Sequence, residues 1–303
     1  MTRRDWSLLL ILSLRWGGSF LFVELALRGL PPLTIVRGRV GLAALILGLV
    51  LWAGRFFGEK SGTSALPRRA RGAVLVMGLL NNAVPFTLFA LAQGRIDGAL
   101  AAIVNATTPL WTVVVAHLFT ADERITPAKA VGLGFGFAGV AIMAGHAGGG
   151  EAAAILACLA AALSYGLAAV WGRRFRGMGV SPLFTAFGQT AGATLLLAPL
   201  WLVLDRPWAM QAPGAGPVLA VVAMAALSTA LAYLIYFRLL ASAGATNLSL
   251  VTFLIPVSAA VLGVVLLNET LLPRHLSGFA LIAAGLLAMD GRVIRRLRER
   301  RAA

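Results

Sequence analysis

The sequence predicts an all-α polytopic membrane protein with ten transmembrane helices, and composition and patterning carry that prediction. Of the 303 residues, 59% are hydrophobic and only 12% are charged, and the mean hydropathy is +0.88. A soluble domain, with about 25% charged residues, could not bury so much apolar surface or cover its outside with so few charges. The hydrophobic residues run continuously and do not alternate, which excludes an outer-membrane β-barrel.

Ten apolar blocks have about the length that a bilayer-spanning helix needs, roughly 20 residues. Polar residues, glycine and proline separate the blocks. The first block follows Arg3 and Arg4 and is too long for the apolar region of a signal peptide, and no small-residue cleavage site closes it. The predicted spans cover approximately residues 5–27, 33–54, 72–93, 98–119, 128–146, 152–172, 182–204, 216–238, 246–267 and 276–290.

The basic residues are distributed unequally between the two sides of these spans. The 26 Lys and Arg against 11 Asp and Glu give a net charge of +15, but they separate apolar blocks and form no basic face for nucleic acid. With a cytoplasmic N-terminus, 19 of them lie in cytoplasmic segments and only Arg28, Arg95, Arg206 and Arg274 lie in outer loops. The positive-inside rule therefore predicts cytoplasmic termini in a bacterial inner (plasma) membrane.

The two halves of the chain resemble each other at an offset of about 147 residues. The segment from Asn105 to Pro109 matches that from Thr252 to Pro256, and Trp16-Gly17 matches Tyr165-Gly166. This predicts two repeats of five spans, residues 1–147 and 148–303, forming one transport unit. Because five is odd, the second repeat enters the membrane with opposite polarity. Inverted repeats are typical of secondary transporters, which bind substrate near mid-bilayer and work by alternating access.

Several short motifs resemble those of the EamA family in the drug/metabolite transporter superfamily. They are Trp16-Gly-Gly-Ser-Phe20 in the first span, Arg39 in the second, Pro109 followed by Asp122-Glu123, and Pro256 followed by Asn268-Glu269. The resemblance implies ten helices, a central cavity and export of amino acids or related metabolites, as in YddG-type amino-acid exporters. Arg15 departs from the pattern, in which an apolar residue precedes the Trp, and Asn268 stands where Gly is commoner.

Polar and aromatic residues inside the spans are the candidate substrate-binding residues, because a polar group in mid-membrane is costly unless it faces a cavity or another helix. The set suits an amphipathic solute with an apolar body, aromatic amino acids among them; each single member could instead be ordinary packing. The candidates come from three spans in each half and are Arg15, Trp16, Ser19, Phe20, Asn81, Asn82, Asn105, Thr108, Ser164, Tyr165, Ser228, Tyr233 and Thr252.

Three prolines inside spans are the candidate hinge residues. Pro85, Pro109 and Pro256 each lack the N–H that would bond to the carbonyl four residues earlier, and each therefore frees a backbone acceptor beside polar side chains. The alternative is that neighbouring helices or waters satisfy these carbonyls and the kinks only shape the packing.

Charged residues within the spans need a partner or water. Arg15 lies about ten residues into the first span, where a central arginine costs roughly 2.5–3.5 kcal/mol. It could hold a substrate carboxylate or extend toward the cytoplasmic face. Glu24 and Arg39 lie toward the outer ends of their spans, so Glu24 could pair with Arg39 or with Arg28 at i+4; proton coupling through Glu24 is the less favoured alternative.

Glycines in the fifth and tenth spans predict close helix packing, either within the chain or between two copies in a homodimer. They are Gly132, Gly136, Gly139, Gly278 and Gly285.

Motifs of other functional classes are missing from the sequence. It has no Gly-rich Lys-Ser/Thr nucleotide loop and no HExxH or GxSxG motif, and its single cysteine, Cys158, excludes an internal disulfide. We therefore expect a transporter of small molecules and no enzyme, with no catalytic residue, metal, cofactor or nucleic-acid partner. The alternatives are a drug, nucleotide-sugar or sugar-phosphate carrier, and less favoured, a membrane-embedded transferase or a channel.

Overall fold

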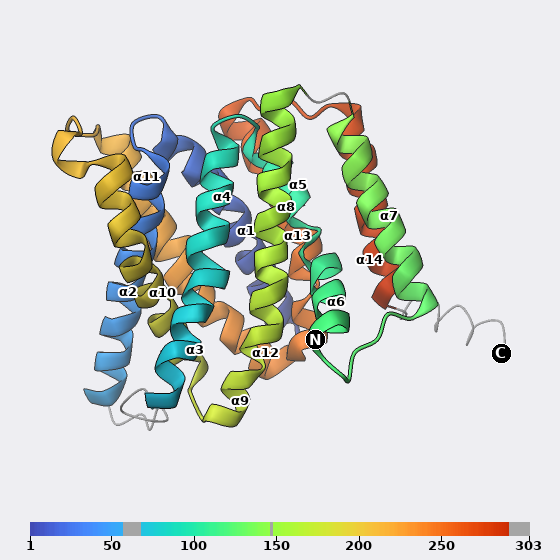
Figure 1. The fold of residues 1–303 in the computed structure, drawn as a ribbon, viewed down its shortest axis with the longest axis horizontal. Helices are drawn as coiled ribbons and strands as arrows, with labels where there is room; N and C mark the ends of the chain where they lie inside the picture. Colours follow the sequence, from blue (N-terminus) through green and yellow to red (C-terminus); the bar gives the residue numbers. More distant parts are fainter. Residues whose placement is uncertain (57–67, 146–147, 291–303) are drawn as a thin grey trace.

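The computed structural model describes residues 1–56, 68–145 and 148–290, and the described chain forms a bundle of helices without strands (Figure 1). Eight helices are long and apolar enough to cross a membrane, and two shorter apolar helices, Val251–Leu267 and Pro273–Met289, complete the set. The chain is therefore an all-α multi-pass membrane protein, as the sequence predicts.

The first half of the chain forms seven α-helices and one π-helical segment. Thr2 caps the first of them by accepting from the N–H of Asp5, whose carboxylate accepts in turn from the N–H of Thr2. The elements are α1 (Arg3–Leu27), α2 (Pro32–Phe56), α3 (Arg68–Gly78), η1 (Leu79–Ala83, π), α4 (Val84–Gln93), α5 (Gly98–Asn105), α6 (Thr108–Phe119) and α7 (Pro127–Ala144).

The second half contains α8 (Gly149–Gly172), α9 (Arg174–Met178), α10 (Pro182–Leu200), η2 (Trp201–Asp205, π), η3 (Pro207–Ala209, 3-10), α11 (Ala215–Ala225), η4 (Ala226–Leu231, π), α12 (Ala232–Leu248), α13 (Val251–Leu267) and α14 (Pro273–Asp290). These bounds lie within a few residues of the predicted spans except near Gly244. There the backbone is non-helical with a φ of 78°, which glycine adopts without strain, and α12 continues to Leu248.

Large apolar side chains cover the outside of the bundle. Leu49 and Trp52 in α2, Leu195 in α10 and Val203 in η2 are each more than 60% exposed. Such a surface would be an aggregation hazard in water and is the expected lipid-facing surface of a membrane protein. The interior, in contrast, contains many alanines and glycines, which allow the helix backbones to approach closely.

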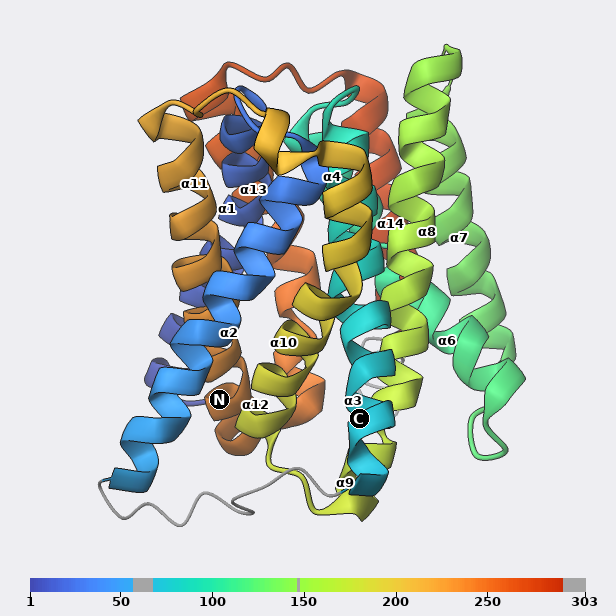
Figure 2. The same cartoon turned by 60° about the vertical axis from the view of Figure 1, so that its left-hand side comes forward.

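Helices α7 and α14 lie side by side and run antiparallel at one edge of the bundle (Figures 1 and 2). A methyl group at Gly132 would lie 2.5 Å from the carbonyl oxygen of Gly285, and one at Gly139 would lie 2.5 Å from that of Gly278. The predicted glycine packing thus occurs within one chain. A homodimer stays a prediction, now without these glycines as its basis.

Two further close crossings join the halves of the chain. Gly17 in α1 packs against α13, where a methyl group would lie 2.8 Å from the backbone nitrogen of Ala259. Gly166 in α8 packs against α6, where a methyl group would lie 3.0 Å from the backbone nitrogen of Thr112. The two glycines are the matching residues of the sequence repeat, so corresponding helices make corresponding crossings.

Candidate functional site

A group of buried and half-buried polar side chains lies inside the bundle where α2, η1, α10 and the η4–α12 segment meet. Its side chains come from both halves of the chain, and hydrogen bonds link several of them across distances of more than 100 residues in sequence. We call it the central polar cluster; its members are Arg39, Asn81, Asn82, Gln189, Ser228, Thr229 and Tyr233.

The π-helical segment η1 presents the two asparagines of the cluster. Pro85 lies just after it and cannot donate to the carbonyl of Asn81, and the helix widens at this point. The hydroxyl of Ser164 in α8 donates to the carbonyl of Leu80 at 2.7 Å. Ser164, a predicted substrate residue, therefore bonds to the backbone of η1. Single π-helical turns inside α-helices occur frequently at functional sites.

The second π-helical segment, η4, occupies the matching place in the other half. Ser228 and Thr229 stand 147 residues after Asn81 and Asn82, and both are buried. The hydroxyl of Thr229 donates to the carbonyl of Met224, five residues earlier, at 3.1 Å. Both halves thus open a helix with a π turn where they present polar residues to the interior.

Arg39 is the buried cation of the cluster, with an exposed fraction of 7%. Its guanidinium lies over the ring of Phe86, 3.7 Å from the centroid, and its Nε donates to Thr229 Oγ1 at 2.9 Å. The sequence placed Arg39 near the outer end of its span and offered Glu24 as its partner. That pairing is wrong, because the partner of Arg39 comes from η4.

Amide and phenol groups connect the π segment η1 to α10 and α12. Asn81 Nδ2 lies 3.2 Å from Gln189 Oε1 and 3.2 Å from the hydroxyl of Tyr233, and Asn82 Nδ2 lies 3.3 Å from the same hydroxyl. Consecutive residues of an α-helix point about 100° apart, yet both asparagines reach Tyr233. The widened π turn accounts for this, because it changes the angular spacing of consecutive side chains.

Two oxygens of the cluster are buried without a hydrogen-bond partner. They are Oδ1 of Asn82 and Oγ of Ser228, on side chains that are 0% and 1% exposed. A buried polar atom without a partner costs about 1–3 kcal/mol. Their position on the two π segments makes them candidate acceptors for donors of a bound solute.

The predicted aromatic residues line the interior beside the cluster. Trp16 in α1 lies 5.7 Å from Tyr236 in α12, measured between ring centroids. Phe20 packs edge-to-face on Phe89 at 5.6 Å, and Tyr165 stacks on Phe89 at 6.3 Å. These rings connect α1, α4, α8 and α12 and form an apolar surface of the kind that an amphipathic solute needs.

The polar residues of the fourth span bond locally. The helix breaks at Ala106 and Thr107, before Pro109, and separates α5 from α6. Thr108 Oγ1 donates to the freed carbonyl of Asn105 at 2.8 Å and lies 3.2 Å from Asn105 Oδ1. The nearby hydroxyl of Thr108 thus satisfies this carbonyl, the kink is present, and the hinge role of Pro109 stays a prediction.

The remaining predicted residues lie outside the cluster's hydrogen bonds. Ser19 is buried in α1, and Thr252 is half-buried in α13, which continues through Pro256. Arg15 is half-buried and makes no hydrogen bond or ion pair with the described part of the chain. Glu24 is half-buried near the outer end of α1, and its Oε2 is sealed without a partner. Their binding or coupling roles stay predictions.

The acidic turn after α13 closes one end of the bundle. Glu269 Oε1 accepts from the N–H of Gly98 at 3.1 Å and Oε2 from that of Ala99 at 2.9 Å. The carboxylate thereby caps the N-terminus of α5, where negative charge is favoured. Burial raises the pKa of Glu269 above its ordinary value, and the two backbone hydrogen bonds partly oppose that shift.

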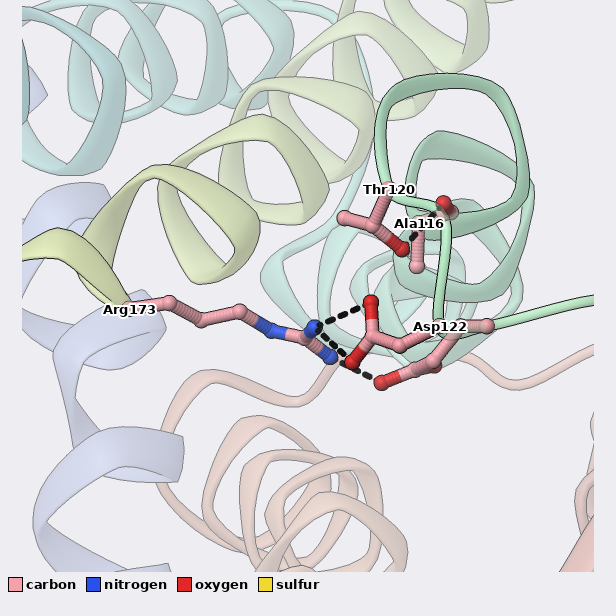
Figure 3. Close-up of polar contacts among 5 residues, drawn as sticks. Ala116, Thr120, Asp122 and Arg173 are labelled. Atoms are coloured by element: carbon pink, nitrogen blue, oxygen red, sulfur yellow. Dashed lines mark hydrogen bonds and ion pairs between the residues drawn. The ribbon is translucent and has the colours of Figure 1, made fainter.

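The matching acidic turn after α6 lies at the opposite end of the bundle. Arg173, just after α8, pairs with Asp122 at 3.1 Å and also with Glu123 (Figure 3). All three side chains are at least one-third exposed. The carboxylate of Glu123 raises the pKa of Arg173 above its ordinary value.

The sequence analysis did not identify Arg39 and Gln189 as members of the site, although it matched Ser228 and Thr229 with the two asparagines. A signal existed for both: Gln189 is a polar residue inside an apolar span, and Arg39 is a further in-span arginine. Their meeting depends on contacts between residues 108 to 190 positions apart, which local patterns do not contain. Within the described ranges, no group of three His, Cys, Asp or Glu could hold a metal ion.

Comparisons with known proteins agree over nearly the whole chain. The model of the EamA-like transporter family matches residues 6–145 and again residues 152–289. The chain is 26% identical to the uncharacterized transporter YvbV of Bacillus subtilis, over 93% of this chain and 90% of that protein. It is 26% identical to the uncharacterized inner membrane transporter YedA of Escherichia coli, over 87% and 83%.

Two further similarities extend this result. A probable amino-acid metabolite efflux pump of Escherichia coli is 24% identical over 94% of each chain. One solved crystal structure aligns with 97% of this chain and 99% of its own at a TM-score of 0.66 and 21% identity, which shows a shared fold. These similarities bear out the predicted family resemblance and the prediction that the protein is no enzyme.

Proposed function

Because the chain belongs to the EamA-like transporter family, we propose that it is a secondary transporter that exports amino acids or related small metabolites. The central polar cluster is the observation that carries this proposal. It collects hydrogen-bonding side chains from both halves of the chain inside a bundle with a lipid-facing exterior. Polar groups are costly at this depth, and those that are present usually mark a functional site. The aromatic rings beside it supply the apolar part of a solute site.

We propose alternating access as the transport mechanism. The two separate matches to one family model, residues 6–145 and 152–289, support two repeats with bounds near 1–147 and 148–303. The antiparallel run of α7 and α14, the matching crossings at Gly17 and Gly166 and the matching π turns support an inverted relation between the repeats. In this mechanism the repeats rock around a site between them and expose it to each side in turn.

We propose that both termini lie in the cytoplasm, and the distribution of basic residues supports this orientation. The start of α1, the end of α2, the start of α3, the turn between α6 and α7, and α9 lie toward the same end of the bundle (Figure 1), and most basic residues of the described chain belong to these segments. The positive-inside rule favours the cytoplasmic side for that end. We propose that the protein resides in a bacterial inner membrane, as YedA does according to its name.

Purified protein in liposomes tests the proposed function directly. Proteoliposomes loaded with a panel of labelled amino acids, amines, sugar phosphates and cationic drugs are monitored for release with and without an imposed proton gradient. We expect release of amino acids. The paired substitution Tyr233→Phe with Asn82→Leu should abolish that release, because it removes the hydrogen bonds that join η1 to α12. Release of only drugs or sugar phosphates, or release unaffected by the paired substitution, contradicts the proposal.

A further inference from the structure

The charge of Arg39 has no counter-charge in the described structure. The ion pairs among the described residues involve Arg173 and Arg274, and the titratable groups that face Arg39 are the neutral phenols of Tyr165 and Tyr233. A cation that is 7% exposed in a membrane bundle carries a desolvation cost of several kcal/mol unless an anion compensates it. The described part of the protein thus contains a buried cation that no described residue neutralises.

The geometry of this guanidinium leaves its binding edge free. Phe86 covers one face and Thr229 receives the hydrogen bond from Nε, so these two contacts fix the orientation of the planar group. The two Nη groups donate to no described residue. They form the paired edge that binds a carboxylate through two parallel hydrogen bonds.

Acceptors without partners stand on the same π segments. Ser228 is the direct neighbour of Thr229, which bonds to Arg39, and Asn82 bonds to Tyr233. The oxygens Ser228 Oγ and Asn82 Oδ1 are buried and lack donors. A free cationic edge together with two free acceptors is complementary to a solute with a carboxylate and an N–H or O–H donor.

We propose that Arg39 binds the carboxylate of the transported solute, and that the substrate class is small monocarboxylates with a neighbouring amino or hydroxyl donor, such as α-amino acids. This inference rests on the proposed transport function and adds its substrate chemistry. One cation among neutral amides and phenols matches one negative charge; a phosphate dianion would need more cations. Thr229 and Phe86 are positioning residues for the guanidinium.

Matched solutes test the inference without any variant. For each amino acid that the wild-type protein releases, four unlabelled competitors are compared: the acid itself, its methyl ester, its primary amide and its decarboxylated amine. The measurement is how strongly each competitor inhibits release of the labelled amino acid. We expect the acid to compete about 10- to 100-fold better than its three analogues, which is the value of a hydrogen-bonded charge pair. Equal competition by acid and ester overturns the inference, and so does preference for phosphate esters.

Substitutions separate a binding role from a structural one. Arg39→Gln should weaken acid binding about 10- to 100-fold and remove the discrimination between acid and ester, and Arg39→Lys should restore part of both. Because the substitution removes an uncompensated buried charge, ligand-free Arg39→Gln should unfold in detergent at a temperature equal to or above that of the wild type. A lower unfolding temperature identifies Arg39 as a structural residue and overturns the inference.

Substitutions of two other arginines serve as the control and as the test of the competing prediction. Arg37→Gln is the matched control, because Arg37 lies on the same helix with its guanidinium over Trp201, and it should leave the discrimination intact. Arg15→Leu tests the sequence prediction that Arg15 holds the carboxylate. If Arg15→Leu alone removes the discrimination, the inference fails while the transport function stands; if the wild-type protein releases no solute of the panel, the proposed function itself fails.

Discussion

The two acidic turns occupy matching places in the two halves of the chain, yet they make different contacts. Glu269 lies against the bundle and caps α5 through two backbone hydrogen bonds. Asp122 and Glu123 remain exposed and pair with Arg173. One end of the bundle is therefore closed by a buried helix cap, and the other end is held by a solvent-screened ion pair.

The two matching helix crossings also differ, in how closely the helices pack. Gly17 leaves no room for a methyl group against the backbone of α13, whereas at Gly166 the nearest atoms of α6 lie at 3.0 Å or more. Matching sequence elements are thus packed tightly on the side of α13 and Glu269 and less tightly on the side of α6 and Glu123. In an alternating-access mechanism, this asymmetry is what one of two exchangeable states would present.

Methyl groups at the two crossings should have the largest effects. Gly17→Ala places a methyl group 2.8 Å from the nitrogen of Ala259 and against Ser258, so the helices must move apart at a cost of about 1–3 kcal/mol. Gly166→Ala should cost less, because shifts of a few tenths of an ångström relieve its contacts. Thermal unfolding in detergent measures both. Gly134→Ala, in open space, is the control, and equal losses at Gly17 and Gly166 would refute the asymmetry.

Substitutions in the two acidic turns should have the next largest effects on stability, and these effects should differ between the two ends of the bundle. Glu269→Ala leaves the N–H groups of Gly98 and Ala99 without an acceptor, and we expect a loss of about 1–3 kcal/mol in unfolding free energy. Glu123→Ala should cost less than about 1 kcal/mol, because its ion pair is exposed. Hydrogen exchange at the amides of α5 gives a local measurement. Exchange that is unchanged in Glu269→Ala would show that the cap is not needed.

The two described ion-pair sites should differ by a smaller amount. Arg173→Gln removes pairs whose partners are 71% and 36% exposed, and we expect a cost of less than about 0.5 kcal/mol that disappears in high salt. Glu151→Gln removes a less exposed pair with Arg274 at 2.9 Å, at the end that Glu269 closes, and should cost more. Unfolding in low and high salt compares them; a larger loss for Arg173→Gln would reverse the order of the two ends.

The sequence predicted the helices well because the bilayer itself imposes the length and apolarity of each span. It also placed polar residues and Pro85 where η1 forms, and Ser228 and Thr229 where η4 forms. Neither π turn was predicted, because a π turn differs from an α turn by one residue and leaves the hydrophobic pattern nearly unchanged.

Contacts between distant segments were the part that local patterns could not supply. Arg39 was assigned to the outer end of its span because its depth was judged from its own helix, whereas its environment is made by η4, about 190 residues later. The cap of α5 by Glu269 joins residues 170 and 171 positions apart. The sequence showed an acidic turn, but the helix end it would reach is a property of the assembled bundle.

The smallest predicted effect is a pH dependence confined to the Glu269 end. Burial, with Asp97 nearby, raises the pKa of Glu269 above the ordinary value of 4.5 despite its backbone hydrogen bonds; Glu24 also lies close enough to interact. A carboxyl whose pKa is raised by folding favours the folded state when protonated. Wild-type stability should therefore fall slightly as pH rises from 4.5 through the folded-state pKa.

Glu269→Gln removes this titration, so the difference in unfolding temperature between wild type and variant should change with pH in that window. Gly134→Ala, which places a methyl group in open space, is the control and should show a difference that does not change with pH. The wild type and the variant share all other titrating groups, so the contributions of those that do not interact with Glu269 cancel. A difference that stays constant for Glu269→Gln would mean that solvent reaches both acidic turns alike, and that the two ends of the bundle are closed in the same way.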